Sequence, residues 1–149
     1  MSDKIIIREA ENNSKDLKQI EDLVKYLMQV ENAENIESNV QKIMQDRIMP
    51  AFDHEIGKIF VAEHKNKIVG FLLVELKFNL VASLAFTAIN PIYQRQGIGT
   101  KLVDAVIKFS KSKNVHIISV LIDKENNNSK AFHEKIGFKL FGYSLRKEI

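Results

Sequence analysis

The sequence predicts a single α/β domain over residues 1–149, in which helices cover both faces of a mixed sheet. The chain of 149 residues is close to the commonest domain size. Apolar residues make up 45% of it and charged residues 28%, which is ordinary globular usage. The hydrophobic pattern changes from helical spacing to adjacent strands after Pro50, and then to alternating helices and strands. Hairpins followed by helical crossovers predict a sheet that is antiparallel first and partly parallel later.

The N-terminal third predicts one strand and two helices. The strand is expected over residues 4–8. Asn13 or Ser14 can cap the first helix, with Asp16 in the first turn, where the helix dipole favours an anion. A weaker amphipathic helix follows, and Pro50 stops it. The apolar positions at helical spacing are Leu17, Ile20, Leu23, Val24 and Leu27, then Ile36, Val40, Ile43, Met44 and Ile48.

The middle of the chain predicts three neighbouring strands. Strands over 58–64 and 68–78 are joined by a tight turn at 65–67 and form a hairpin. The nearly all-apolar stretch over 80–89 predicts a further strand, buried on both faces.

The C-terminal part alternates helix and strand. A helix is expected from about 98 to 111, a buried strand over 116–122, and a short helix over 129–136 that Gly137 ends. Residues 138–146 are expected to form a final strand, or two abbreviated strands about Gly142. The complete order is β-α-α-β-β-β-α-β-α-β.

Composition excludes several classes of site and partner. With no cysteine, the chain has no disulfide, cysteine-ligated zinc or thiol nucleophile. The longest apolar run, residues 68–74, is far shorter than the roughly 20 residues of a membrane-spanning helix. The apolar start of the chain is too short for a signal peptide, so a cytoplasmic protein is expected. His54, His64 and His116 show no ligand spacing, so no metal site is predicted.

The net charge is distributed unevenly along the chain. A total of +3 is too small to indicate nucleic acid, which we do not expect as a partner. Residues 1–90 hold 11 Lys and Arg against 14 Asp and Glu, whereas residues 91–149 hold 11 against 5. Two interpretations remain open: solvated surface charge, or a basic half that meets a phosphorylated ligand.

The segment over residues 90–102 is typical of a phosphate-binding loop. It lies between a predicted buried strand and a helix, and Gly97 and Gly99 allow the backbone to approach a ligand closely. The first N–H groups of the helix have no partners within it and point toward an anion. Gln94, Arg95 and Gln96 add side-chain donors on the same rim.

Two other phosphate motifs do not match this segment. No Gly-Lys-Ser/Thr follows, which excludes the Walker pattern, and Leu102 stands where the dinucleotide fingerprint needs a third glycine. An isolated Gly-x-Gly would more often be a simple turn before a helix. The strand, proline, Gln-x-x-Gly-x-Gly and helix together favour the phosphate site.

The chain resembles the GNAT superfamily of acetyl-CoA-dependent N-acetyltransferases. The family's phosphate motif, Gln/Arg-x-x-Gly-x-Gly/Ala, is matched by Gln94, Gly97 and Gly99, and Ile89 matches the apolar residue two before the proline. A second family motif is matched in order and spacing by Asn126, Ser129, Phe132, His133, Glu134, Lys135, Gly137 and Phe138. The resemblance covers nearly the whole chain and implies the family's acyl-CoA N-acyltransferase fold, with a splayed central sheet.

The resemblance implies acetyl-CoA as cofactor and a site for each of its parts. The pantetheine arm would enter between splayed strands, where a bulge near Ala88 and Ile89 exposes backbone donors. Asn126 and Ser129 would line the pantetheine from the other side. The loop that would hold the pyrophosphate comprises Gln94, Arg95, Gln96, Gly97, Ile98, Gly99 and Thr100.

The resemblance also implies acetyl transfer to a primary amine through a tetrahedral intermediate. His133 stands where most of the family carries a tyrosine acid, and some branches, including the phosphinothricin-type acetyltransferases, also have histidine there. An imidazole with an ordinary pKa near 6.5 can protonate a thiolate whose conjugate acid titrates near 8.5. The competing interpretation is a packing residue beside Phe132.

Glu75 is the candidate general base. Strand alternation puts it on the face of Phe71 and Leu73, where burial would raise the pKa of its carboxyl and let it accept a proton through water. The competing interpretation is a strand-end glutamate that reaches solvent or pairs with Lys77. Tyr143 could line the acceptor pocket.

The sequence says less about the acceptor amine and the oligomeric state than about the cofactor site. Residues 31–55 contain six acidic and two basic residues, which suggests a wall that attracts a cationic small-molecule or peptide amine, or a merely solvated helix. The short C-terminus leaves a sheet edge with which a second subunit could pair as a homodimer. Two other functions stay open: a non-catalytic acyl-CoA-binding module, and nucleotide binding at the same loop.

Overall fold

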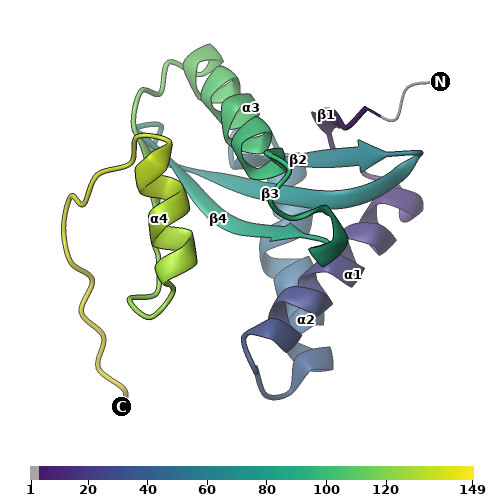
Figure 1. The fold of residues 1–149 in the computed structure, drawn as a ribbon, viewed down its shortest axis with the longest axis horizontal. Coiled ribbons are helices and arrows are strands. Elements are labelled where there is room, and N and C mark those ends of the chain that lie inside the picture. Colours follow the sequence, from purple (N-terminus) through teal and green to yellow (C-terminus); the bar gives the residue numbers. More distant parts are fainter. Residues whose placement is uncertain (1–3) are drawn as a thin grey trace.

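The computed structural model describes residues 4–149 and confirms the predicted mixed α/β architecture (Figure 1). One five-stranded sheet runs in the order β1-β2-β3-β4-β5. Its first three pairings are antiparallel and the last, between β4 and β5, is parallel. The strands are β1 (Ile6–Glu9), β2 (Gly57–His64), β3 (Lys67–Lys77), β4 (Val81–Ile89) and β5 (Ile118–Val120).

The first face of the sheet is covered by the N-terminal helices. α1 (Ser14–Val30) is capped by Asn13, whose side chain accepts from the Asp16 N–H (2.8 Å). α2 (Ile36–Ile43) continues without interruption into the π-helical turn η1 (Met44–Ile48) and the 3-10 turn η2 (Met49–Phe52). The sequence placed the end of this helical segment at Pro50; the structure accommodates the proline in the first turn of η2 and ends the segment just after it.

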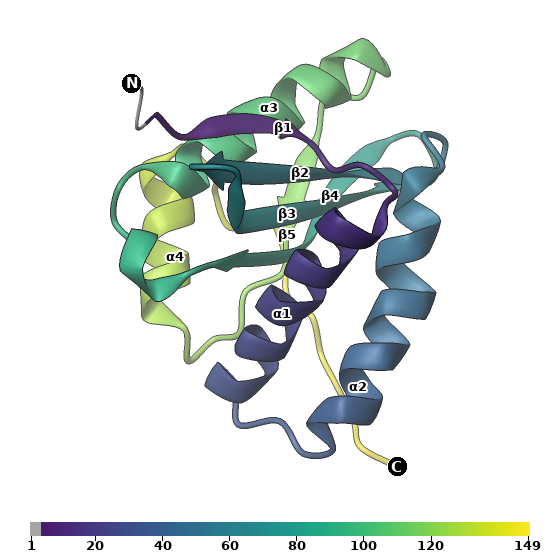
Figure 2. The same cartoon turned by 90° about the vertical axis from the view of Figure 1, so that its right-hand side faces the viewer.

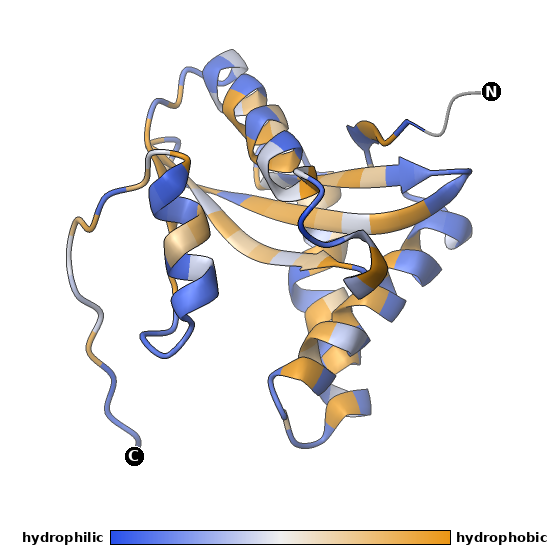
Figure 3. Cartoon of the chain, viewed as in Figure 1, coloured by the Kyte–Doolittle hydropathy of each residue, from blue (hydrophilic) through white to orange (hydrophobic). Residues whose placement is uncertain are grey.

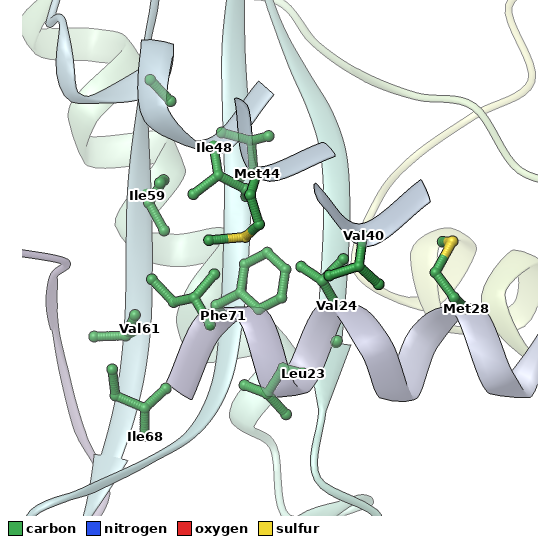
Figure 4. Close-up of a cluster of buried hydrophobic side chains, with 14 residues drawn as sticks. Leu23, Val24, Met28, Val40, Met44, Ile48, Ile59, Val61, Ile68 and Phe71 are labelled. Carbon is green, nitrogen blue, oxygen red and sulfur yellow. The ribbon is translucent and has the colours of Figure 1, made fainter. Parts of the chain in front are cut away.

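A continuous apolar cluster joins α1, α2 and η1 to this face (Figure 4). Phe71 on β3 is fully buried at its centre, next to Met44 and Val24. Helical spacing on one side and strand alternation on the other place apolar side chains face to face. The buried members are Ile20, Leu23, Val24, Met28, Val40, Met44, Ile48, Ala51, Ile59, Val61, Ile68, Phe71, Leu73 and Ala88.

The opposite face packs against α3 (Ile98–Ser112) (Figure 2). Leu102 and Val106 are fully buried against Leu72 and Val74. Apolar residues are accordingly concentrated on β2, β3, β4 and the inner sides of the helices, whereas α4 (Asn127–Lys135) is mostly hydrophilic (Figure 3). No helix in the described part of the chain is both long and apolar enough to cross a bilayer.

β4 and β5 diverge, as the sequence predicted from the family resemblance. β5 pairs with β4 over Ala82–Leu84, and its pairing stops there although β4 continues to Ile89. The remaining half of β4 is hydrogen-bonded to β3 on one side and has an unpaired edge on the side of β5. This divergence provides the opening beside which the two sequence motifs lie.

Four sequence predictions about this region are wrong. The strand expected over 80–89 is not buried on both faces, since only Ala82, Leu84 and Ala88 of β4 are buried. The bulge expected near Ala88 and Ile89 lies earlier, at Ala85, because Phe86 pairs with Leu73 and Leu84 with Val74. The strand expected over 116–122 is confined to Ile118–Val120 and is not buried, since it lies at the sheet edge.

The fourth wrong prediction concerns the end of the chain. Residues 138–146 form no strand, although their alternating pattern suits one, because this part of the described chain lies beside no strand with which to hydrogen-bond. Gly137 does end α4 in a left-handed conformation (φ 107°), as expected. Phe138 then donates its N–H to His133 O (2.9 Å), which closes the helix end.

Candidate active site

The loop between β4 and α3 positions backbone donors at the start of a helix. The 3-10 turn η3 (Pro91–Tyr93) follows β4, and Asn90 caps it by accepting from the Ile92 N–H (3.1 Å). The chain then passes through left-handed conformations at Arg95 (φ 64°) and Gly97 (φ 78°). Glycine adopts this conformation at low cost, which explains its presence immediately before α3.

The first N–H groups of α3 are available to a ligand. The first hydrogen bond at this end joins Lys101 N–H to Gly97 O (3.1 Å), so the N–H groups of Ile98, Gly99 and Thr100 precede the helical ladder. The side chain of Ile98 is buried and anchors the turn. The first turn of α3 carries no acidic residue, so no carboxylate there competes with a bound anion for the positive end of the helix dipole. The geometry therefore fits a bound phosphate.

The predicted side-chain donors of the loop brace the loop itself. Gln94 donates to Ile89 O (3.1 Å) and Gln96 donates to Ile92 O (3.3 Å). Gln94 thereby holds the loop against the end of β4. Arg95 is exposed and contributes positive charge at the same rim.

The unpaired half of β4 presents backbone groups to the opening. Asn90 N–H donates to Val69 O on β3 (2.8 Å). Backbone groups alternate sides along a strand, so the Ala88 N–H also faces β3, while those of Thr87 and Ile89 face the unpaired edge. Ala88 itself is buried in the core. The sequence identified Ile89 and missed Thr87, because the position of the bulge sets which residues face outward.

α4 brings the second motif against the loop. A Cβ built on Gly99 would lie 3.0 Å from Phe132 Cζ, so the Phe132 ring packs directly on the glycine. Asn126 caps α4 by accepting from the Ser129 N–H (3.0 Å), which leaves the amide nitrogen of Asn126 free to donate elsewhere. The structure therefore brings together the two motifs that the sequence identified separately.

The hydrogen-bond partners of His133 determine which of its ring nitrogens carries a hydrogen. Its Nδ1 lies 2.7 Å from Ser129 O and 3.3 Å from Ser129 Oγ. A carbonyl oxygen can only accept, so Nδ1 carries the hydrogen and Nε2 is the atom left to exchange a proton. The ring stands edge-on between Phe132 and Phe138, with centroids 4.9 and 5.2 Å away. His133 can therefore pack against the two phenylalanine rings and still exchange a proton at Nε2.

Glu75 lies on the predicted face of β3, but the pKa of its carboxyl is shifted in the direction opposite to the expected one. Arg47 on η1 donates to it from Nε (2.7 Å) and from Nη2 (2.6 Å), and Lys77 lies 3.4 Å from the same carboxylate. The hydrogen bond from Arg47 lowers the pKa of Glu75, against the opposing effect of burial. The raised pKa expected from the sequence is wrong, because the sequence did not reveal Arg47 as its partner.

Arg47 also joins this pair to the aromatic residue on the adjacent strand. Its guanidinium lies 5.1 Å from the ring centroid of Phe86, which follows the bulge on β4. Arg47 belongs to the acidic segment 31–55, where the sequence treated it as surface charge. Elsewhere in that segment, Glu37 pairs with Lys25 (2.9 Å) and Glu55 lies 3.7 Å from Lys113. Within residues 4–149, no cluster of three potential metal-ligating side chains occurs.

Comparison with known proteins agrees with this geometry. The model of the Acetyltransferase (GNAT) family matches residues 21–138. A 5-NmdU N-acetyltransferase of Pseudomonas phage PaMx11 is 28% identical over 93 residues, which are 62% of this chain and 64% of that protein. The chain thus spans less than two thirds of the length of this relative.

Solved structures of the same fold cover most of the chain. An acetyltransferase from Streptococcus agalactiae 2603 has a TM-score of 0.77 and 25% identity, covering 93% of this chain and 85% of that one. The PaiA N-acetyltransferase from Thermoplasma acidophilum, solved in complex with coenzyme A, has a TM-score of 0.80 and 20% identity, covering 95% and 93%. The resemblance inferred from the two motifs is confirmed. The chain belongs to the GNAT family of acetyltransferases.

Proposed function

We propose that residues 1–149 form one acetyltransferase domain that transfers an acetyl group from acetyl-CoA directly to a primary amine. The observation that carries this proposal is the row of unpaired N–H groups at the start of α3, beside the unpaired half of β4. These two features provide one donor site for a diphosphate and a second for an extended amide-containing arm. Acetyl-CoA supplies the activated acetyl thioester.

In this proposal the chain binds the cofactor through three elements. The loop over residues 94–100 holds the pyrophosphate through backbone N–H groups, with Arg95 adding charge. The edge of β4 at Thr87 and Ile89 binds the pantetheine arm, while Ala88 holds that strand against β3. Asn126, the N-cap of α4, and Ser129 in the first turn of that helix contact the arm.

His133 is the proposed acid for the departing thiolate. With Nδ1 committed to Ser129 O, a protonated ring presents its second proton at Nε2. Donation from Nε2 leaves the neutral ring still hydrogen-bonded to Ser129, so the ring need not rotate during the transfer. The fixed N–H groups on the β4 edge would face the developing oxyanion.

The incoming amine must lose a proton, because a primary amine with a pKa near 10.4 is protonated at pH 7. Glu75 is the proposed acceptor, acting through water. Its lowered pKa keeps it ionised and therefore able to attract the ammonium, although Arg47 makes it a weak base. We propose that attraction of the cation is its larger contribution.

The acceptor is proposed to be a cationic small-molecule or peptide amine. The excess of acidic residues over 31–55 and the ionised Glu75 favour a positive charge on the side of the sheet covered by α2 and η1. We also propose that the protein is cytoplasmic, because acetyl-CoA is supplied there. The unpaired edge of β5 favours a homodimer.

A thiol-release assay with acetyl-CoA and a panel of amines tests the proposal. Release that depends on one class of cationic amine is the expected result. Gln then replaces acidic residues that form no ion pair within the structure, such as Glu31 and Glu34. The KM for the amine should rise in these variants. Acetyl-CoA binding without thiol release on any amine would instead identify a non-catalytic acyl-CoA-binding module. Competition by ATP with equal affinity would identify a nucleotide site.

A further inference from the structure

The contacts that hold Arg47 occupy only part of its guanidinium. Its Nε and Nη2 donate to Glu75 (2.7 and 2.6 Å), and its central carbon lies 5.1 Å from the ring centroid of Phe86. The side chain of Glu75 is 11% exposed, whereas that of Arg47 is 41% exposed. Within residues 4–149, Nη1 of Arg47 donates to no other residue. The pair therefore covers one edge of the guanidinium and leaves the opposite edge accessible.

The open edge has the geometry that a carboxylate requires. A guanidinium is planar and carries five N–H groups, of which Glu75 takes two. One N–H group of Nη1 and the second of Nη2 point in parallel, so together they can donate to both oxygens of one carboxylate. Glu75 and Phe86 already restrict the Arg47 side chain, so binding a ligand costs little further side-chain entropy.

The bulge in β4 places the aromatic ring beside this guanidinium. Ala85 is the extra residue of the bulge. Ala85 and Phe86 both pack on the apolar cluster covered by α2 and η1, although neighbours in a regular strand face opposite sides. The next residue, Thr87, belongs to the edge of β4 that is proposed above to bind acetyl-CoA. Arg47 is thus held by the residue that directly precedes the proposed cofactor edge.

The charges of this cluster do not balance. Arg47 and Lys77 each carry a positive charge, and both donate to the carboxylate of Glu75. Hydrogen bonding from Arg47 lowers the pKa of Glu75, so this carboxylate is ionised at pH 7 and supplies the single negative charge. The three side chains therefore leave one positive charge unmatched. An acceptor whose ammonium is attracted by Glu75 can match that charge only if the same molecule also brings an anion.

We propose that Arg47 determines acceptor specificity by binding a carboxylate through Nη1 and Nη2, so that the acceptor is an amino acid. The ammonium of the acceptor faces Glu75, and its carboxylate accepts from the open edge of Arg47. This narrows the cationic amine of the proposed function to one that also carries a carboxylate, and the inference rests on that function.

Acceptor binding to the full chain in the presence of coenzyme A, measured by calorimetry, tests the inference without requiring turnover. The probes are α-amino acids and ω-amino acids such as β-alanine, each paired with its carboxamide, which keeps the ammonium and removes the carboxylate. At least one acid should bind about tenfold or more tightly than its amide, since a hydrogen-bonded charge pair is lost in the amide. Equal binding of acid and amide in every pair, or no binding of any acid, overturns the inference.

Variants of the cluster test whether Arg47 is the source of this preference. Arg47→Lys keeps the positive charge beside Glu75 and removes the parallel N–H groups, so acid and amide should then bind within about twofold of each other. Phe86→Leu leaves the ion pair in place but removes the ring beside it, and should reduce the preference. Lys42→Gln, at an exposed cation on α2, is the matched control and should keep the native preference. A native preference in Arg47→Lys overturns the inference.

Thiol release on the same acid and amide pairs separates this inference from the proposed function. Release from acetyl-CoA with equal kcat/KM for acid and amide in every pair supports the proposed function and overturns the inference. Arg47-dependent binding of an acid, without release on any amine, supports the carboxylate site and overturns the proposed function.

Discussion

Gly99 at the start of α3 lies in contact with Phe132 of α4, and a Cβ added to the glycine would reach to 3.0 Å from Phe132 Cζ. The contact joins the two motifs from which the family was inferred. It also explains a glycine inside a helix, where glycine is otherwise unfavourable. The close approach keeps the N–H groups of the loop on the same side of the opening as Asn126 and His133.

Replacing Gly99 by Ala should therefore weaken coenzyme A binding without unfolding the chain. The new Cβ forces the Phe132 ring away and displaces α4, while alanine itself favours the helix. We expect the Kd measured by calorimetry to rise about tenfold, or about 1.4 kcal/mol. The double variant Gly99→Ala/Phe132→Leu relieves the clash and should recover most of the affinity. Native affinity in the single variant would show that the contact does not position the site.

Replacing His133 by Gln should separate chemistry from binding. If Nε2 supplies the proton to the leaving thiolate, kcat falls by about 10²- to 10⁴-fold while the Kd for coenzyme A is unchanged. Glu134→Gln, on the exposed side of the same helix, is the control. A kcat within twofold of the native value would leave His133 with a packing role beside Phe132 and Phe138.

Replacing Glu75 by Gln should raise the KM for the amine and leave cofactor binding intact. The change removes an ionised carboxylate from the proposed acceptor side. It also leaves the guanidinium of Arg47 without its bidentate partner, at a cost of about 1–2 kcal/mol because Arg47 is partly exposed. Glu55→Gln, at an exposed acid, provides the comparison. An unchanged KM together with lower stability would assign Glu75 a structural role alone.

Asp16 should make the stability of the chain depend on pH. Arg8 donates to both of its carboxylate oxygens (2.8 and 3.0 Å), and hydrogen bonding from Arg8 lowers the pKa of Asp16 below its ordinary 3.8. A lowered pKa in the folded state contributes stability that is present above pH 3.8 and is lost as the pH falls through the folded-state pKa.

Urea unfolding of Asp16→Asn checks this expectation. The variant should be about 2 kcal/mol less stable than the native chain at pH 7, and the difference should shrink in strong acid. Asp22→Asn removes an exposed pair with Lys18 and should cost less than about 0.5 kcal/mol at either pH. A difference for Asp16→Asn that stays constant with pH would contradict the lowered pKa.

The sequence predicted those features that depend on local chemistry. The Asn13 side chain caps the start of α1, and the glycines Gly97 before α3 and Gly137 after α4 suit left-handed backbone. Apolar periodicity identified the two faces of the sheet for the same reason. These signals lie within a few residues of one another, so no knowledge of distant contacts was needed.

Features that depend on distant partners were missed. Arg47 reaches Glu75 across two elements, and this pairing reversed the expected direction of the carboxyl pKa. The bulge at Ala85 depends on the register between β3 and β4, which alternation alone does not fix. Residues 138–146 have the pattern of a strand, yet a strand forms only where it can hydrogen-bond to a neighbour, and none of the strands β1–β5 pairs with them.

The central claim is that backbone N–H groups at the start of α3 hold the diphosphate of coenzyme A. Amide NMR spectra recorded during titration with coenzyme A, and separately with pantetheine, test it most directly because pantetheine lacks the diphosphate. Coenzyme A should shift the amide signals of Gly97, Gly99 and Thr100, and pantetheine should leave these signals in place while shifting those of Thr87 and Ile89. Saturable coenzyme A binding that leaves the amides of residues 97–100 unmoved would contradict the account.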